Sequence, residues 1–202
     1  MATCYIIGAG DFFGGFEPSE DDLIIAADGG YDSLKKKGIA PHLLIGDLDS
    51  VEKLPEGIEI IRFPVEKDDT DSFLAYREGV KRGFRDFEIY GGTGGREDHT
   101  FANLSLLLYA RERGHRARLV SSRNTAFVIK DEEIRIKGEP GKHFSAFAFG
   151  CNAEGVTLRG LQYCAEDITL TAEFPLAVSN LFTDSTAVVS VKRGALLIMT
   201  EN

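Results

Sequence analysis

LLIGDLDS, residues 43–50, is the stretch that decides the fold, because an apolar run passes directly into two aspartates. Three other apolar runs in the first half of the chain end in a similar way. Residues 23–27 lead into DGG, residues 58–63 are followed by KDDTD (67–71), and residues 87–90 lead into GGTGGREDH (91–99). If the runs are parallel strands, all four loops leave the same edge of one sheet, where open α/β folds bind ligands. Carboxylates gathered there predict a metal and phosphate site.

The first part of the chain alternates strand-like and helix-like segments. Strands are expected over residues 3–8, 23–27, 42–45, 58–63, 86–90 and 117–121. Helices are expected over about 30–37, 70–82 and 99–113, where apolar residues recur at helical spacing. This alternation predicts an α/β domain over residues 1–123, with a parallel sheet covered by helices on both faces.

After about Arg123 the pattern changes to short alternating segments separated by turn residues. Strands are expected over residues 125–130, 133–137, 144–149, 155–158, 168–174, 187–192 and 195–200. IRIK (134–137) and VSVK (189–192) show the two-residue period most clearly. The pattern predicts a small all-β domain over residues 124–202, built as a sandwich or a barrel.

Composition excludes several classes of protein. The net charge of −9 argues against nucleic acid, because a phosphate backbone needs a basic surface. The three cysteines form no CxxC pair, which favours a reduced compartment. The N-terminus has no basic region before its apolar stretch, and no apolar run approaches the roughly 20 residues needed to span a bilayer. A cytoplasmic protein without a membrane or nucleic-acid partner is expected.

The segment GDLDS (46–50) is a candidate magnesium site. Asp47 and Asp49 lie two residues apart after a buried strand, so in extended backbone their side chains point to the same side. Magnesium commonly takes one or two carboxylates together with substrate phosphates. A polar turn is the alternative, since Asp, Gly and Ser are frequent turn residues. From this segment alone both interpretations remain open.

The segment KDDTD (67–71) precedes a predicted helix. Thr70 or Asp69 could cap that helix, but capping explains only one or two residues of the segment. Because a helix N-terminus also binds anions, Thr70 could meet a phosphate while Asp71 meets its metal. Lys67 could then neutralise phosphate charge.

The segment GGTGGREDH (91–99) has the composition of a phosphate-binding loop. Its glycines allow backbone N–H groups to approach an anion, and Arg96 offers a planar fork of donors. The alternative is a flexible connection with an aspartate cap. The combination of glycines, Arg96 and Asp98 favours the phosphate-binding loop. GAGDFF (8–13) lacks the sixth-position Gly or Ala of the dinucleotide pattern, and could still form a first turn close to phosphate.

These segments together resemble the signature segments of thiamine pyrophosphokinases. The resemblance rests on ADGG (27–30), GDLDS (46–50), KDDTD (67–71) and GGREDH (94–99), followed by Asn103. Later, GLQY (160–163) and FPLAVSN (174–180) are similar to the thiamine-binding half of that family. Each motif alone identifies the family only weakly, but the motifs occur in the order typical of the family, which is specific. The resemblance covers nearly the whole chain.

The resemblance implies an ATP-dependent transferase. Members of the family have an α/β catalytic domain that binds ATP and magnesium, here residues 1–123, followed by a thiamine-binding β-domain, here residues 124–202. They transfer a diphosphate from ATP to the hydroxyethyl group of thiamine and release AMP. They form homodimers whose active sites lie between the catalytic domain of one subunit and the β-domain of the other.

The resemblance also implies roles for individual residues. The implied magnesium ligands are Asp47, Asp49 and Asp71. The implied catalytic residues, at the phosphate site, are Asp71, Lys67, Arg96 and Asp98. The residues implied to bind ATP are Asp28, Gly29, Thr70, Thr93, Gly94, His99 and Asn103. Ser179 and Asn180 are implied to contact thiamine.

Two departures from the family pattern lie in the acceptor half. Leu181 stands where many bacterial members carry an acid, and Cys164-Ala165 stands where Pro and an apolar residue are common. One alternative is therefore a diphosphokinase for another hydroxymethyl heterocycle, or a nucleotide hydrolase. Another is a non-catalytic nucleotide or thiamine sensor, against which the intact acidic set argues.

Overall fold

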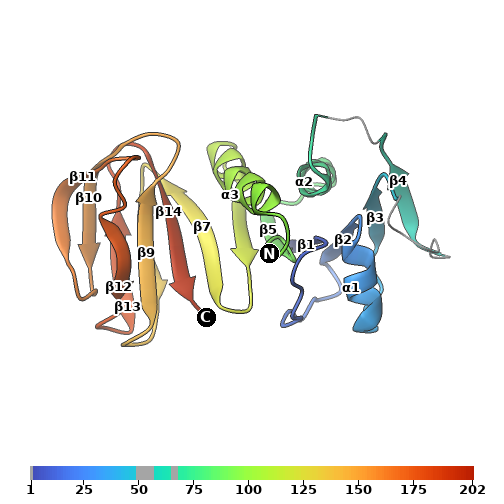
Figure 1. Ribbon diagram of the computed structural model, residues 1–202, viewed down its shortest axis with the longest axis horizontal. Helices are drawn as coiled ribbons and strands as arrows, with labels where there is room; N and C mark the ends of the chain where they lie inside the picture. The colour runs from blue at the N-terminus through green and yellow to red at the C-terminus, as the bar shows by residue number, and fades with distance from the viewer. Residues whose placement is uncertain (1, 49–56, 65–67) are drawn as a thin grey trace. The chain divides into compact units, whose positions relative to one another are not determined.

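The chain divides into two compact units, Met1–Ala110 with Gly114–Ser122, and Arg111–Arg113 with Arg123–Asn202. This division was found in a computed structural model that describes residues 2–48, 57–64 and 68–202 (Figure 1). The first unit contains a sheet and the helices, and the second is built from strands. An N-terminal domain followed by a β-domain is the organisation expected from the sequence.

The strands of the first unit form a parallel sheet. They are β1 (Thr3–Ile7), β2 (Leu23–Ala27), β3 (Leu43–Gly46), β4 (Glu59–Arg62), β5 (Asp86–Tyr90) and β6 (Arg116–Val120), in the order β6-β5-β1-β2-β3-β4. Each recorded pairing among them is parallel. β2 and β3 are buried along their whole length, whereas β4 is partly exposed at the sheet edge. The carboxyl ends of these strands therefore meet at one edge.

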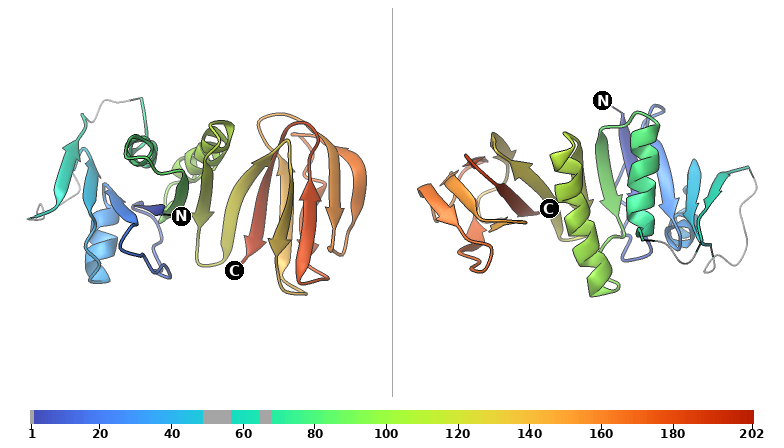
Figure 2. Two further views of the ribbon diagram at one scale, coloured as in Figure 1. Left: turned by 180° about the vertical axis from the view of Figure 1, so that it is seen from behind. Right: turned by 90° about the horizontal axis from the view of Figure 1, so that it is seen from above.

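Helices cover both faces of this sheet (Figures 1 and 2). Because successive strand residues point to opposite faces, Tyr5 packs in a cluster with Leu34 of α1 (Gly30–Lys36), and Cys4 faces α2 (Asp71–Lys81). A Cβ at Gly79 of α2 would lie 2.9 Å from the Cys4 sulfur, so this glycine allows the close approach of helix and sheet. Burial raises the pKa of the Cys4 thiol far above its usual range. Cys4 is therefore a core residue.

α3 (Glu97–Glu112) lies beside α2 on the same face. The ring of Tyr109 lies 5.2 Å from Phe73 and 6.0 Å from Tyr76, measured between centroids. Tyr76 also contacts Phe87 of β5, and its hydroxyl is 2.6 Å from the Nδ1 of His115. Aromatic contacts therefore join both helices to the sheet.

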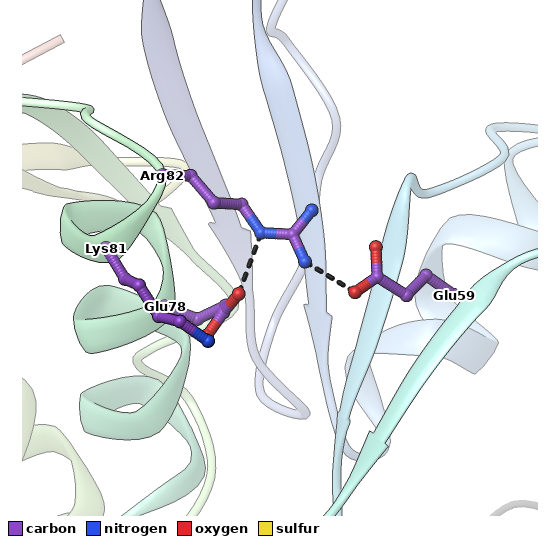
Figure 3. A network of polar contacts seen from close by, with 4 residues as sticks. All are labelled: Glu59, Glu78, Lys81 and Arg82. Carbon is purple, nitrogen blue, oxygen red and sulfur yellow. Dashed lines mark hydrogen bonds and ion pairs between the residues drawn. The ribbon is translucent and has the colours of Figure 1, made fainter.

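An ionic network connects the edge strand β4 to α2 (Figure 3). The Nη2 of Arg82 donates to Glu59 at 2.6 Å, and its Nε donates to Glu78 at 2.9 Å. Lys81 lies 3.4 Å from the other carboxylate oxygen of Glu78. The network joins the start of β4 to the end of α2, the two elements that flank residues 63–70.

The second unit is a β-sandwich. Its strands are β7 (Asn124–Lys130), β8 (Glu133–Lys137), β9 (His143–Ala148), β10 (Ala153–Arg159), β11 (Ala165–Leu170), β12 (Ala177–Leu181), β13 (Thr186–Ser190) and β14 (Ala195–Glu201). They form the antiparallel groups β12-β9-β14-β7 and β11-β10-β13-β8. Side chains of both groups share one core, in which Phe144 and Phe182 meet edge to face.

The structure corrects the expected elements in two places. β12 was not expected as a strand, because a register shift between Ala177 and Asn180 and the left-handed φ of 58° at Ser179 interrupt its alternation. β11 covers residues 165–170 rather than 168–174, and most of its residues are not buried, so its periodicity is weak. The other boundaries match or shift by at most two residues, as where α3 begins at Glu97 rather than His99. Within the described residues, no helix is long and apolar enough to span a membrane.

Candidate active site

The first unit contains a cleft of about 230 Å³ at the carboxyl edge of its sheet. Its walls come from the loops after β1, β2 and β5 and from the first turns of α2 and α3. The lining residues are Gly8, Ala9, Gly10, Ala27, Asp28, Thr70, Asp71, Ser72, Gly91, Gly92, Thr93, Gly95, Arg96, His99, Thr100 and Asn103. Loops from separate parts of the sequence thus meet at the edge where ligands bind in such folds.

The cleft brings together most of the described residues that the sequence assigned to the phosphate half. Those that line it are Asp28, Thr70, Asp71, Thr93, Arg96, His99 and Asn103. Gly29, Gly94 and Asp98 adjoin these residues in the chain without being part of the lining. Asp47, after β3, is also not part of the lining. Asp49 and Lys67 lie outside the described residues.

Two glycine-containing loops are joined by backbone hydrogen bonds that continue the pairing of β1 with β5. Gly10 N donates to Gly91 O at 2.8 Å, and Asp11 N donates to Thr93 O at the same distance. A Cβ on Gly10 would lie 2.2 Å from the Thr93 carbonyl oxygen, and one on Gly91 would lie 2.4 Å from Gly8 O. These glycines are therefore required for the loops to meet. GAGDFF (8–13), which matched no nucleotide pattern, contributes the first wall of the cleft.

The ends of β2 and β3 also lie against each other. Asp28 has a left-handed φ of 46°, and its N–H donates to Ile45 O at 2.7 Å. A Cβ on Gly46 would lie 3.1 Å from the Asp28 Cβ. The loop with Asp28 therefore lies beside the residue that precedes Asp47, and two acidic loops meet at this edge.

The residues at the start of α2 both cap the helix and line the cleft. The Oγ1 of Thr70 accepts a hydrogen bond from Phe73 N at 3.4 Å, so Thr70 is the N-cap. Asp69 forms an ion pair with Arg77. The capping alternative thus accounts for Thr70 and not for Asp71, the first residue of the helix, which lines the cleft. The first turn presents backbone N–H groups that suit an anion.

Arg96 is held by Asp98 through a two-point ion pair. The Nε and Nη2 of Arg96 donate to the two carboxylate oxygens of Asp98 at 3.1 and 2.6 Å. This hydrogen bonding lowers the pKa of Asp98 and raises that of Arg96. Asp98 also accepts from His99 N at 2.9 Å. Asp98 therefore orients the guanidinium that lines the cleft.

Asn103 is buried, and its Nδ2 donates to Gly92 O at 2.9 Å. Its amide nitrogen thus supports the glycine loop from α3. The sequence had singled out this residue only through the resemblance. A polar residue on a face with buried Leu106, Leu107 and Ala110 was the signal that could have indicated a structural hydrogen bond.

No group of three His, Cys, Asp or Glu side chains arranged to hold a metal occurs within residues 2–48, 57–64 and 68–202. Asp49, one of the three implied magnesium ligands, is not among these residues. The described carboxylates Asp47 and Asp71 follow β3 and begin α2, respectively. Since magnesium usually takes only one or two carboxylates and completes its shell with phosphate and water, this donor set fits it.

The two residues implied to contact thiamine have different environments in the second unit. Asn180 is 2% exposed; its Oδ1 accepts from Tyr163 N and Leu181 N, and its Nδ2 donates to Tyr163 O. Ser179 is exposed, and its N–H donates to Ser145 Oγ at 3.1 Å. Asn180 therefore holds the 160–163 turn to β12, and Ser179 is at the surface.

Large aromatic and apolar side chains are exposed in the segments that carry these two residues or are bonded to Asn180. They are Tyr163, Phe174, Leu176 and Val178. Asn180 connects the turn that contains Tyr163 to the strand that contains Val178. Solvated apolar side chains gathered in residues 174–178, next to the turn with Tyr163, are typical of a surface that contacts another molecule.

The fold and cleft define an α/β domain with a cleft at the carboxyl edge of its parallel sheet, followed by a β-sandwich. Residues 18–119 match the family model for the thiamin pyrophosphokinase catalytic domain, and residues 131–196 match that for its vitamin B1 binding domain. The chain belongs to the thiamin pyrophosphokinase family.

Individual relatives are similar over nearly the whole chain. A Bacillus subtilis (strain 168) protein named thiamine pyrophosphokinase is 28% identical over 189 residues, which cover 89% of this chain and 87% of the relative. The crystal structure of thiamine pyrophosphokinase from Bacillus subtilis has a TM-score of 0.89 at 26% identity, covering 100% of this chain and 99% of that chain. A thiamin pyrophosphokinase family protein from Enterococcus faecalis has a TM-score of 0.88, with the same identity and coverage.

Proposed function

We propose that this protein transfers a diphosphate group from ATP to the hydroxyethyl group of thiamine, giving thiamine diphosphate and AMP. The observation that carries the proposal is the cleft at the sheet edge, in a chain whose halves match the catalytic and vitamin B1 binding models. The cleft combines glycine loops, a helix N-terminus, an arginine and carboxylates. That combination suits a triphosphate better than an uncharged ligand.

The phosphate chain would lie among the first turn of α2, the glycine loops and Arg96. Backbone N–H groups at Thr70 and Asp71 and in residues 91–95 supply donors that need little reorganisation. Arg96, oriented by Asp98, supplies positive charge, and Lys67 is proposed to add to it. Asp28, Gly29, Thr93, Gly94, His99 and Asn103 complete the proposed ATP site, with Asn103 acting through the loop it holds.

Magnesium is the proposed metal, held by Asp47, Asp49 and Asp71. When bound, the ion would supply charge neutralisation for the phosphate oxygens. Asp47 follows β3 and Asp71 begins α2, at the carboxyl edge of the same sheet, and this common edge supports the assignment. Both provide the hard oxygen ligands that magnesium prefers.

The chain's own contribution to the reaction is positioning and charge stabilisation. The hydroxyl oxygen of thiamine attacks the β-phosphorus of ATP in line, the bond to the α-phosphate oxygen breaks, and AMP leaves. Arg96 and Lys67 would stabilise charge that develops on the transferring group. The backbone pairing of the two glycine loops holds the donors in place before substrate arrives.

Thiamine is proposed to bind to the second unit, residues 124–202, through Ser179 and Asn180. Because Asn180 uses its amide atoms on Tyr163 and Leu181, it would act mainly by shaping the site. Its neighbour Ser179 is exposed and accessible to a ligand. The exposed apolar residues Phe174, Leu176 and Val178 support a homodimer in which the β-domain of one subunit completes the active site of its partner. We also propose a cytoplasmic location for the protein.

One assay tests the proposed function directly. The protein is incubated with ATP, magnesium and thiamine, and the products are separated by chromatography. Thiamine diphosphate together with AMP, and not ADP, is the expected result. AMP formed equally without thiamine would instead identify a nucleotide hydrolase. Ligand-induced stabilisation without any AMP would identify a sensor.

A further inference from the structure

Ser72 is a polar residue on the buried face of α2. The buried residues of this helix include Ser72, Ala75, Tyr76 and Gly79, which follow the i, i+3, i+4, i+7 spacing of one helix face. Tyr76 contacts Phe87 of β5, and Gly79 lies against Phe87 and Cys4, so this face packs on the sheet. An apolar residue would be expected at each of these positions, and Ser72 is 8% exposed.

The Ser72 hydroxyl has no recorded hydrogen bond in the part of the chain that the structure describes. None of the hydrogen bonds found among residues 2–48, 57–64 and 68–202 involves its Oγ. Ser72 follows the N-cap Thr70 by two residues, so the chain four residues before it is not helical and offers it no helix carbonyl. The Ser72 Oγ is not one of the buried polar atoms that lack a partner, so the hydroxyl keeps access to the solvent of the cleft that Ser72 lines. A hydroxyl at the wall of a cleft, on an otherwise buried residue and without a recorded partner in the described chain, is available to a ligand bound there.

The position of Ser72 indicates that ligand. Ser72 lines the cleft together with Thr70, Asp71 and residues of the first glycine loop. We propose that the Ser72 hydroxyl donates a hydrogen bond to a phosphate oxygen of the nucleotide bound in this cleft. The first turn of α2 then offers the anion backbone N–H groups and a side-chain hydroxyl together. The identity of the nucleotide as ATP rests on the proposed function.

The test compares Ser72→Ala with Ser105→Ala. Ser105 lies on α3, where its Oγ donates to Phe101 O at 3.0 Å, and it does not line the cleft. Binding of magnesium–ATP is measured by isothermal titration calorimetry in the absence of thiamine. Loss of a hydrogen bond to a charged acceptor weakens binding roughly tenfold or more. We expect this loss for Ser72→Ala and binding within about twofold of wild type for Ser105→Ala.

Two further measurements separate a binding role from a structural one. The melting temperature of unliganded Ser72→Ala should equal or exceed that of wild type, because alanine is apolar and a stronger helix former. In steady-state assays the KM for ATP should rise while the KM for thiamine stays unchanged. ATP affinity within twofold of wild type, or a loss of affinity accompanied by a lower melting temperature, would overturn the proposal.

The binding measurement does not depend on turnover. If the wild-type protein formed no thiamine diphosphate, the proposed function would fail, while the comparison of ATP affinities would still decide the role of Ser72. Conversely, unchanged ATP affinity in Ser72→Ala would leave the assay for thiamine diphosphate unaffected.

Discussion

The side-chain amide of Asn103 donates a hydrogen bond to the carbonyl oxygen of Gly92 at 2.9 Å, and both groups are buried. This contact joins α3 to the glycine loop that lines the cleft. A Cβ on Gly92 would lie 2.9 Å from the Asn103 Nδ2, so the loop approaches the helix as closely as a glycine allows. The geometry of the loop therefore depends on a side chain that follows it by eleven residues.

Replacing Asn103 with alanine should destabilise the first unit. The variant leaves the Gly92 carbonyl without its buried donor, which costs about 1–3 kcal/mol of unfolding free energy. Urea denaturation followed by circular dichroism measures the change, and the KM for ATP should rise because the loop loses its support. Ser105→Ala on the same helix should change stability by less than about 0.5 kcal/mol. Equal stabilities for the two variants would contradict the assigned role.

Gly10→Ala and Gly95→Ala form a matched pair at the cleft. A Cβ on Gly10 would lie 2.2 Å from Thr93 O, whereas the nearest atom to one on Gly95 is 3.9 Å away. We expect Gly10→Ala to lower the melting temperature and abolish ATP binding, since the joined loops must separate. Gly95→Ala should leave stability unchanged or raise it by about 0.4–1 kcal/mol. Differential scanning fluorimetry distinguishes these outcomes, and similar melting temperatures would be inconsistent with loop pairing.

The proposed magnesium ligands are tested with Asp47→Asn and Asp71→Asn. Each variant should abolish turnover while the circular dichroism spectrum stays that of wild type, because a charged ligand is removed without a change in size. Removing magnesium with EDTA should stop turnover of wild type, and added magnesium should restore it. Asp69→Asn is the control from the same segment, since Asp69 pairs with Arg77. Near-wild-type turnover in both ligand variants would refute the assignment.

Asn180 and Ser179 should respond differently to alanine. Asn180→Ala removes three hydrogen bonds to the Tyr163 and Leu181 backbone and should cost about 2–4 kcal/mol of unfolding free energy. Ser179→Ala should leave stability nearly unchanged and raise the KM for thiamine, with the KM for ATP unaffected. Chemical denaturation and two-substrate kinetics measure the effects. A destabilised Ser179→Ala with an unchanged KM for thiamine would reverse the assigned roles.

The contact of Glu59 with Arg82 should give stability a dependence on pH. The hydrogen bond from Arg82 lowers the pKa of Glu59 below its ordinary value of 4.5. A lowered carboxyl pKa stabilises the fold above the unfolded-state value, and that contribution is lost as the pH falls through the folded-state value. The difference in urea midpoint between wild type and Glu59→Gln should therefore be present at neutral pH and shrink below pH 4.5.

Two controls accompany this prediction. High salt should reduce the same difference at neutral pH, because the pair is exposed to solvent. Lys81→Met removes the longer contact between Lys81 and Glu78, at 3.4 Å; both residues are labelled in Figure 3. This variant should change the urea midpoint little. A difference between wild type and Glu59→Gln that persists unchanged in acid would exclude an ionic origin.

Much of the fold could be predicted from local sequence. β2, β5 and β8 have the expected bounds, because their apolar runs or two-residue alternation are uninterrupted. β12 could not be predicted, since its bulge depends on pairing with β9, a strand distant in the sequence. His115, which follows the end of α3, is buried against Tyr76. The hydroxyl of Tyr76, which bonds the buried ring, is distant in the sequence, so local sequence could not predict this burial.

By itself, the sequence determined which residues reach the sheet edge, because apolar runs bury themselves as strands and leave the aspartates and glycines that follow them at strand ends. Only the tertiary structure decided which structural role each of these residues has. Thr70 is a cap, Asp98 orients Arg96, and Asn103 and Asn180 hold turns. The reason is physical: burial follows from local periodicity, whereas a hydrogen-bond partner is whichever group the folded chain brings within about 3 Å.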